Sequence, residues 1–166
     1  MPKTNSKKVR PLDRTDRQIL TALQADGRIS NVSLAKKVNL TTTPCLERVR
    51  RLERDGFIKG YTALLDSQMV DAGLLVFVEI SLMRNSPDGF KAFRRQAKRL
   101  SGILECHLVS GNFDYLIKAR VKDILEYRKL LGEQILALPG VSDSRSYVVM
   151  EEIKETSFIS LFPDVN

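Results

Sequence analysis

The chain has 166 residues, of which 43% are hydrophobic and 28% charged, and its formal net charge is +7. No apolar run approaches the roughly 18 residues that a membrane-spanning helix needs, and no apolar segment follows the basic N-terminus as it does in a signal peptide. The two cysteines match no metal-binding spacing. These features argue against a membrane protein and a disulfide-built domain. They predict a cytoplasmic globular protein without a metal site.

The positive charge is confined to the first third of the chain. Residues 1–60 contain 14 Lys and Arg against 6 Asp and Glu, a net of +8, whereas residues 61–166 contain 13 against 14, a net of −1. Such a local excess is typical of a domain that binds a polyanion. Residues 1–11 are polar and basic, which predicts a flexible arm. That arm either follows phosphates or serves only to keep the protein soluble.

Three short helices are predicted in residues 12–60. The first begins after Asp13 and the second after Ser30, because both side chains are favourable N-caps. Asn39 suits the left-handed backbone of a tight turn, and Thr41 is expected to cap a third helix. Two helices joined by such a turn predict a helix-turn-helix domain.

The third helix carries four arginines within seven residues, in the sequence PCLERVRRLERD. Its apolar residues share one side, and we expect Arg51 to point away from them with the other charged residues beside it. The helix would enter the major groove, where arginine pairs with guanine and glutamate accepts from cytosine. Residues near the helix starts would contact phosphates or base edges. The predicted DNA-binding residues are Arg28, Ser30, Asn31, Thr41, Thr42, Thr43, Glu47, Arg48, Arg50 and Arg51.

Two alternatives remain open for this domain: a charged helix face that is only solvated, and a three-helix bundle that binds protein. Residues 57–65 are largely apolar, and Gly60 permits a bend, so this segment predicts a strand that serves as a wing or as a linker. We expect residues 61–72 to form a linker or hinge between the first domain and a second one.

The second domain, residues 73–154, is predicted as an α+β sandwich of the ferredoxin-like βαββαβ type. Two consecutive β-α-β units indicate this fold, with strands and helices at 74–83, 87–100, 103–110, 115–121, 123–138 and 141–153. Several strands are apolar on both faces, yet two helices cover only one face. We expect a second copy's sheet to cover the other face in a homodimer, with residues 57–65 as the alternative cover.

No catalytic group emerges from the sequence, so an enzyme is not expected. Cys106 and His107 are neighbours on a predicted strand and therefore face opposite sides, which excludes a Cys–His pair. No phosphate-binding loop or nucleophile elbow is present. The helix at 87–100 carries five basic residues after its start, which indicates a solvated face or a contact with wrapped DNA.

The turn Gly111-Asn112-Phe113-Asp114 permits two interpretations. Glycine and asparagine are ordinary hairpin residues, so the turn has a purely structural explanation. Glycine also leaves backbone accessible, and the Asp114 carboxylate could hold an ammonium group, so a small amino acid could dock there.

Four long stretches carry a family resemblance, and they read LDRTDRQILTALQADGRIS, PCLERVRRLERDGFIKGYTALL, ECHLVSGNFDYLIKARV and YRKLLGEQILALPGVSDSRSYVVMEEIK. They resemble the leucine-responsive branch of the Lrp/AsnC family of transcription regulators. The resemblance runs from Leu12 to Lys154. It implies a regulator, either activator or repressor, that binds double-stranded DNA, forms homodimers and assembles into octamers or larger particles. It implies an amino-acid effector, expected to be leucine, and no other cofactor.

In that family the effector lies between dimers, near the loop that matches residues 111–114. The resemblance therefore implies an effector site formed by Leu108, Gly111, Asn112, Asp114, Tyr147, Val148 and Val149. Two departures from the family bear on function: Thr41-Thr42 replaces a usual Ser-Pro pair, and Asn112 replaces a common acid. The tail at 155–166 is apolar in part, and we expect it to pack between dimers. The alternative function is an architectural DNA-binding protein without an effector.

Overall fold

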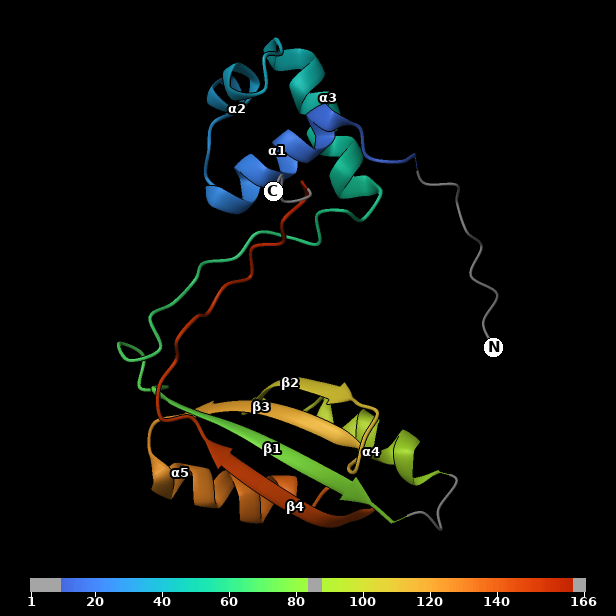
Figure 1. Cartoon of the computed structure of the whole chain (residues 1–166), viewed down its shortest axis with the longest axis vertical. Helices are drawn as coiled ribbons and strands as arrows, with labels where there is room; N and C mark the ends of the chain where they lie inside the picture. Colours follow the sequence, from blue (N-terminus) through green and yellow to red (C-terminus); the bar gives the residue numbers. More distant parts are fainter. Residues whose placement is uncertain (1–9, 84–87, 163–166) are drawn as a thin grey trace. The chain divides into compact units, whose positions relative to one another are not determined.

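The computed structural model describes residues 10–83 and 88–162, which form two compact units (Figure 1). The first unit includes residues up to Leu64 together with the segment from Glu155 onward. The second unit runs from Leu65 to Lys154. Residues 1–9, most of the predicted basic arm, lie outside the described residues, as do 84–87 and 163–166.

Three helices build the first unit: α1 (Arg14–Ala25), α2 (Asn31–Lys37) and α3 (Thr42–Arg54). Asp13 caps α1 as predicted, because its carboxylate accepts from the Asp16 backbone N–H at 2.8 Å, while Asp16 returns the bond at 3.1 Å. This reciprocal pattern satisfies two backbone donors that would otherwise lack partners. Ser30 likewise caps α2 by accepting from the Ser33 N–H at 3.1 Å.

The start of α3 differs from the prediction in one respect. Asn39 adopts the expected left-handed backbone, with a φ of 55°, and Thr41 occupies the N-cap position. The Thr41 side chain makes no capping hydrogen bond, however. Its hydroxyl is exposed rather than committed to the helix.

The predicted strand at 57–65 is wrong, since no residue of this segment belongs to a strand. Gly56 has a φ of 81° and donates to the Glu53 carbonyl at 3.0 Å, and Phe57 donates to the Leu52 carbonyl at 2.9 Å. These two bonds form the Schellman arrangement that ends α3. The apolar segment that was predicted to be a strand therefore starts with the residues that end α3. Ile58 in this segment packs against the core of the first unit.

That core is formed by residues from all three helices. Ile19 of α1, Leu34 of α2, and Cys45 and Leu52 of α3 are each at most 1% exposed. Burial raises the pKa of the Cys45 thiol, as expected for a small core hydrophobe.

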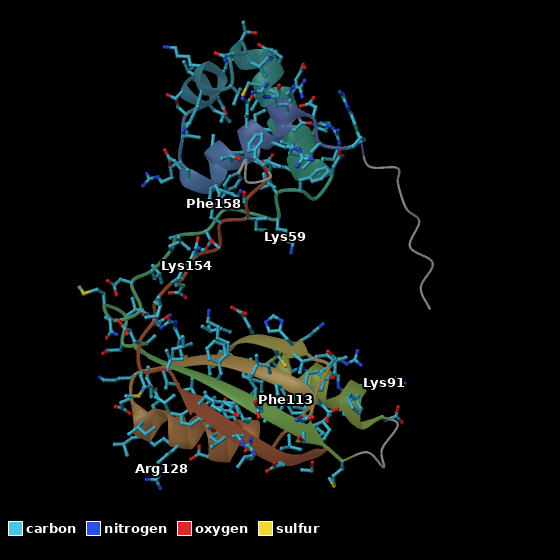
Figure 2. All side chains as sticks on the ribbon, in the orientation of Figure 1. Lys59, Lys91, Phe113, Arg128, Lys154 and Phe158 are labelled. Atoms are coloured by element: carbon cyan, nitrogen blue, oxygen red, sulfur yellow. The ribbon has the colours of Figure 1, made fainter. Side chains whose placement is uncertain are left out.

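The C-terminal tail packs against α1 of the same chain, where the sequence suggested a position between dimers. The Gln24 side chain forms two bonds with the backbone of Ile159, donating at 3.0 Å and accepting at 2.8 Å. Arg17 donates to the Leu161 carbonyl at 2.8 Å, and the Leu161 side chain joins the apolar core. Figure 2 labels Phe158 in this segment. The tail is thus part of the first unit.

The second unit has the predicted ferredoxin-like topology. Its sheet has the order β2-β3-β1-β4, and every pairing is antiparallel. The elements are β1 (Leu74–Leu82), α4 (Gly89–Ala97), β2 (Ile103–Leu108), β3 (Tyr115–Val121), α5 (Ile124–Lys129), the π-helix η1 (Leu130–Ile135) and β4 (Val141–Val148). Both helices pack on one face of this sheet (Figure 1).

The helix expected at 87–100 spans Gly89–Ala97, the strand expected to reach residue 110 ends at Leu108, and two further elements differ more clearly from their predictions. The helix expected over 123–138 changes from α to π geometry at Leu130, and the Leu136 N–H reaches back five residues to the Leu131 carbonyl at 2.9 Å. The strand expected to reach residue 153 ends at Val148, the last residue paired with β1, and only the Val149 N–H still donates to the Leu75 carbonyl beyond it.

The helix-covered face of the sheet forms the core of the second unit. Val76, Val78 and Ile80 of β1 are fully buried with Ile117 of β3, against Phe93 of α4. The rings of Phe93 and Tyr115 lie 4.4 Å apart between centroids, which adds a favourable aromatic contact to the area that they bury.

The opposite face is more polar than the sequence suggested. Leu75 and Phe77 point to this face, but Glu79 shares it, since side chains alternate along β1. On the adjoining strands the face includes Lys118, which lies 3.3 Å from Glu105. The predicted apolar surface is therefore interrupted by charged residues, which a second copy's sheet would have to accommodate.

Candidate DNA interface and effector site

The exposed face of α3 consists of Thr43, Glu47, Arg50 and Arg54. These residues follow each other at intervals of four, three and four, which places them on one side of the helix. At the N-terminus of the same helix, Thr41 and Thr42 are also exposed. This face presents hydroxyl, carboxylate and guanidinium groups of the types that read base edges in the major groove.

The residues predicted for phosphate contacts are likewise accessible. Ser30 and Asn31 lie at the start of α2, and Arg28 lies in the turn before it, all three exposed. The structure therefore leaves eight of the ten predicted DNA-binding residues available to a partner, and these are Arg28, Ser30, Asn31, Thr41, Thr42, Thr43, Glu47 and Arg50.

Arg48 and Arg51 are placed differently from the prediction. Arg48 lies 2.6 Å from the Asp13 carboxylate and 2.8 Å from that of Asp16, and Arg51 lies 2.6 Å from Asp16. The Arg51 side chain is only 14% exposed. It does not point away from the apolar side of α3, as the helical projection suggested, but lies on a flank that faces α1.

Asp16 lies at the centre of this cluster and is fully buried. Burial alone would raise its pKa, but the Arg51 guanidinium, the Asp13 backbone N–H and the Arg48 guanidinium together hold that pKa below its ordinary value. Asp16 is consequently ionised at neutral pH and pairs with both arginines. Because the arginines belong to α3 and the carboxylates to the start of α1, the cluster fixes the orientation of α3 in the bundle.

In the second unit, Asp114 has a clear structural role. Its carboxylate accepts from the Leu82 backbone N–H at 2.7 Å, and its own N–H donates to the Ile80 carbonyl at 2.9 Å. These bonds attach the turn between β2 and β3 to the end of β1. Gly111 has a φ of 153°, a conformation that other residues rarely adopt, and its surroundings are open. The turn therefore combines accessible backbone with a carboxylate that is anchored in place.

Tyr147, Val148 and Val149 lie toward the other end of the sheet, where Tyr147 and Val148 pair with Phe77 and Val76 of β1. The Val149 N–H donates to the Leu75 carbonyl at 3.0 Å, whereas Asp114 is bonded to Ile80. Leu75 and Ile80 are five residues apart on β1, which corresponds to about 17 Å along a strand. One chain therefore does not bring the two groups of predicted effector residues together.

A groove that the sequence did not indicate runs between α4 and the edge strand β2. Its volume is about 340 Å³, and its lining includes Leu104, Cys106 and Leu108. Arg94 and Lys98 of α4 also line it, and the Arg94 Nε donates to the Tyr115 hydroxyl at 3.1 Å. Among the predicted effector residues only Leu108 borders this groove, because the turn at 111–114 lies outside it.

The neighbours of Cys106 form a hydrogen-bonded pair on the surface. The Glu105 carboxylate and the His107 ring are 2.9 Å apart, and this contact lowers the pKa of Glu105. Cys106 is exposed but points to the other face of β2, where it lines the groove beside α4, and partial desolvation there raises the pKa of its thiol. Within residues 10–83 and 88–162, no group of three or more His, Cys, Asp or Glu is arranged to hold a metal ion. In the same residues, no helix is long and apolar enough to cross a membrane.

Family models match both units. The model described as Lrp/AsnC ligand binding domain matches residues 75–159, and the model described as winged helix-turn-helix DNA-binding matches residues 12–59. The chain belongs to the Lrp/AsnC family. It is therefore a transcription regulator rather than an enzyme, with a DNA-binding unit and a unit that binds an amino-acid ligand.

Among members of the Lrp/AsnC family, the chain is 64% identical to the leucine-responsive regulatory proteins of Escherichia coli K12 and Klebsiella pneumoniae. The match covers 88% of this chain and 89% of each relative. An AsnC family regulator from Agrobacterium tumefaciens is 36% identical with a TM-score of 0.85, covering 89% and 96% of the two chains. A regulator from Neisseria meningitidis in complex with L-Met is 35% identical with a TM-score of 0.84, covering 89% and 95%.

Proposed function

We propose that this protein is a leucine-responsive transcription regulator that binds double-stranded DNA as a homodimer and assembles further, to an octamer or larger. The observation that carries the proposal is the 64% identity to leucine-responsive regulatory proteins, which extends over 88% of the chain. A match of this length includes both units. The match therefore includes both the segments proposed to bind DNA and those proposed to bind the effector.

For DNA recognition, we propose that the exposed face of α3 reads base edges. Thr42, Thr43, Glu47 and Arg50 would supply these contacts, while Arg28, Ser30, Asn31 and Thr41 would hold phosphates. Arg48 and Arg51 would act indirectly, because their charges are paired with Asp13 and Asp16.

The matched variants Arg50→Ala and Arg48→Ala test this division. Loss of a bidentate base contact costs about 1–3 kcal/mol on a specific site. Arg50→Ala should therefore weaken specific binding by that amount, with little change in thermal stability or in binding to unrelated DNA. Arg48→Ala should instead lower the melting temperature of the first unit. Equal losses on all DNA sequences for Arg50→Ala would show that Arg50 contacts phosphate.

For the effector, we propose that leucine binds where the turn at 111–114 of one copy meets the end of β4 of another. Two features support a site shared between copies. Asp114 and Val149 are attached to opposite ends of β1, so residues about 17 Å apart in one chain require a second chain to converge. The turn offers the backbone of Gly111 and a carboxylate, which suit the ammonium and carboxylate groups of an amino acid.

Methionine is the second candidate effector, since the Neisseria relative was solved with L-Met. Both side chains are unbranched at Cβ and apolar, and a pocket separates such ligands by only about 1–3 kcal/mol. The competition between leucine and methionine therefore belongs in the same experiment.

The effector proposal is tested by titrating the protein onto its DNA with leucine, methionine, alanine or no addition, and by measuring its mass under each condition. We expect leucine to change DNA affinity or particle size at lower concentration than the other two. Indifference to all three amino acids would favour an architectural protein without an effector.

Variants of Asp114 make the test specific to the site. Asp114→Asn keeps a carbonyl oxygen that can accept from the Leu82 N–H but removes the charge, whereas Asp114→Ala removes both. We expect Asp114→Asn to fold and bind DNA normally while losing the effector response. If it responds to leucine as the natural protein does, the carboxylate serves only the turn.

A further inference from the structure

Helix α4 presents a continuous basic face. Lys91, Arg94, Arg95 and Lys98 are exposed and follow each other at helical spacing, and Arg99 comes directly after them. A surface hollow of about 380 Å³ is lined by the first four of these side chains and by no other described residue. Figure 2 labels Lys91 on this helix. The hollow is therefore bordered by cationic groups alone.

This face contrasts with the charge of its surroundings. Residues 88–99 contain five Lys and Arg against one acid, a net of +4. The remainder of residues 61–166 contains 8 basic against 13 acidic residues, a net of −5. The cations are thus concentrated on one helix of an otherwise acidic region, which sets them apart from the general excess in the first third of the chain.

Little within the second unit neutralises these charges. The ion pair between Lys91 and Asp88 spans 3.3 Å, but the two side chains are 81% and 86% exposed, and such pairs contribute little. Arg94 donates to the Tyr115 hydroxyl, a neutral partner. No ion pair within the described part of the chain involves Arg95 or Lys98.

The arrangement is unfavourable for the helix itself. Lys91 and Arg95, and also Arg94 and Lys98, are like charges four residues apart, and each such pair destabilises an isolated helix by about 0.2–0.5 kcal/mol. The fold does not need these charges, because α4 packs through Phe90, Phe93 and Ala97. An anionic partner would relieve the repulsion and would explain why the charges are placed together.

We propose that the basic face of α4 is a second DNA-binding surface, which holds phosphates of the duplex that α3 recognises. Lys and Arg side chains on one helix face suit a row of phosphates, and phosphate contacts carry no sequence information. Duplex DNA is the favoured occupant because the DNA-binding unit of the same chain already binds this polyanion, and a row of cations suits its phosphates.

The test compares two triple variants of the full chain that remove the same charge. One is Lys91→Gln/Arg95→Gln/Lys98→Gln on α4, which leaves the Arg94–Tyr115 bond intact. The matched control is Lys122→Gln/Arg128→Gln/Lys129→Gln, whose residues are exposed at and before α5. Figure 2 shows Arg128 extending from α5 away from the sheet. DNA affinity is measured over a series of salt concentrations, with specific and unrelated duplexes of the same length.

Each phosphate contact contributes about 0.9 to the slope of log affinity against log salt. We expect the α4 variant to reduce this slope by up to about 2.7, equally on specific and unrelated DNA, while the control changes it much less. Melting temperature should not fall, because repulsion has been removed.

Three outcomes would overturn the proposal. If neither variant alters the slope, α4 is a solvated face. If both alter it equally, net charge rather than the α4 face is responsible. If DNA binding is unchanged but the α4 variant loses binding to vesicles of anionic phospholipid, the partner is a membrane surface. In each case the preference for specific over unrelated DNA still reports on α3. Failure of the α4 proposal is therefore distinguishable from failure of the proposed DNA recognition by α3.

Discussion

The two units differ in how many of their packing contacts a single chain supplies. The first unit closes its own structure: α1 and α3 are joined by paired charges, and the tail returns to fill part of the core. The second unit covers one face of its sheet with helices, and the other face carries buried Leu75 beside partly exposed Phe77 and charged residues. Its predicted effector residues lie at opposite ends of β1.

This difference indicates which of the proposed functions would depend on assembly. The exposed face of α3 is already oriented within one chain, because Asp16 holds Arg48 and Arg51. The proposed effector residues are far apart in one chain, so the proposed site would form only where copies meet. We therefore expect changes in the first unit to act on stability and DNA binding directly, and changes in the second to act through oligomers.

The largest expected effect comes from Asp16→Ala. Removing one member of a buried ion pair leaves uncompensated charge and costs about 3–5 kcal/mol. The total free energy of unfolding of a unit of this size is only a few kcal/mol larger than this loss. We expect the first unit to unfold at much lower denaturant concentration, with loss of DNA binding, while the unfolding transition of the second unit stays in place. Two probes, one in each unit, would separate the transitions.

Two controls sharpen this prediction. Glu47→Ala removes an exposed acid from α3 and should change stability by less than about 0.5 kcal/mol. The pH dependence is the second control. Because the folded-state pKa of Asp16 is lowered, its contribution is complete above the ordinary value of 3.8 and is lost as the pH falls below it. The difference between natural protein and Asp16→Ala should therefore shrink below pH 4; a difference that persisted there would argue against the ion pair.

A smaller effect is expected from Leu161→Ala in the tail. Its side chain is partly buried in the first core, and about 0.8 kcal/mol per buried CH₂ gives a loss of roughly 1–2 kcal/mol. We expect this loss of unfolding free energy in the first unit, although Leu161 follows the second unit in the chain. Chemical denaturation followed by probes in each unit measures it.

Ile159→Ala is the matched control, because the Ile159 side chain is 68% exposed while its backbone makes the bonds to Gln24. It should leave stability nearly unchanged. If Leu161→Ala instead lowers the stability of the second unit, the tail would belong to that unit in solution, and the contrast drawn between the two units would fail.

Local rules predicted much of the fold. The caps at Asp13 and Ser30, the turn at Asn39 and the strand Tyr115–Val121 were found as expected, because each depends on residues close in sequence. The strand predicted at 57–65 was wrong because the local apolar pattern was not what decided the structure there. Its apolar pattern favoured a strand, but Gly56 provided a helix end that required the following backbone N–H groups.

The site was predicted less completely, because its decisive contacts are distant in sequence. Arg48 lies 35 residues from Asp13 and 32 from Asp16, so a projection of α3 alone could not reveal that it faces α1. The Asp13–Asp16 spacing identified a helix start but not a second partner for each carboxylate. The tail contacts, 135 and 144 residues apart, gave no local signal at all.

Because the tail returns to α1, the first unit can complete its core only late in synthesis. Leu161 leaves the ribosome only after more than a hundred residues have followed α3, at roughly 5–20 residues per second. Until then the DNA-binding unit lacks one of its core side chains, although its three helices have long been made. In a nascent chain, α3 is therefore present before the core of the first unit is complete.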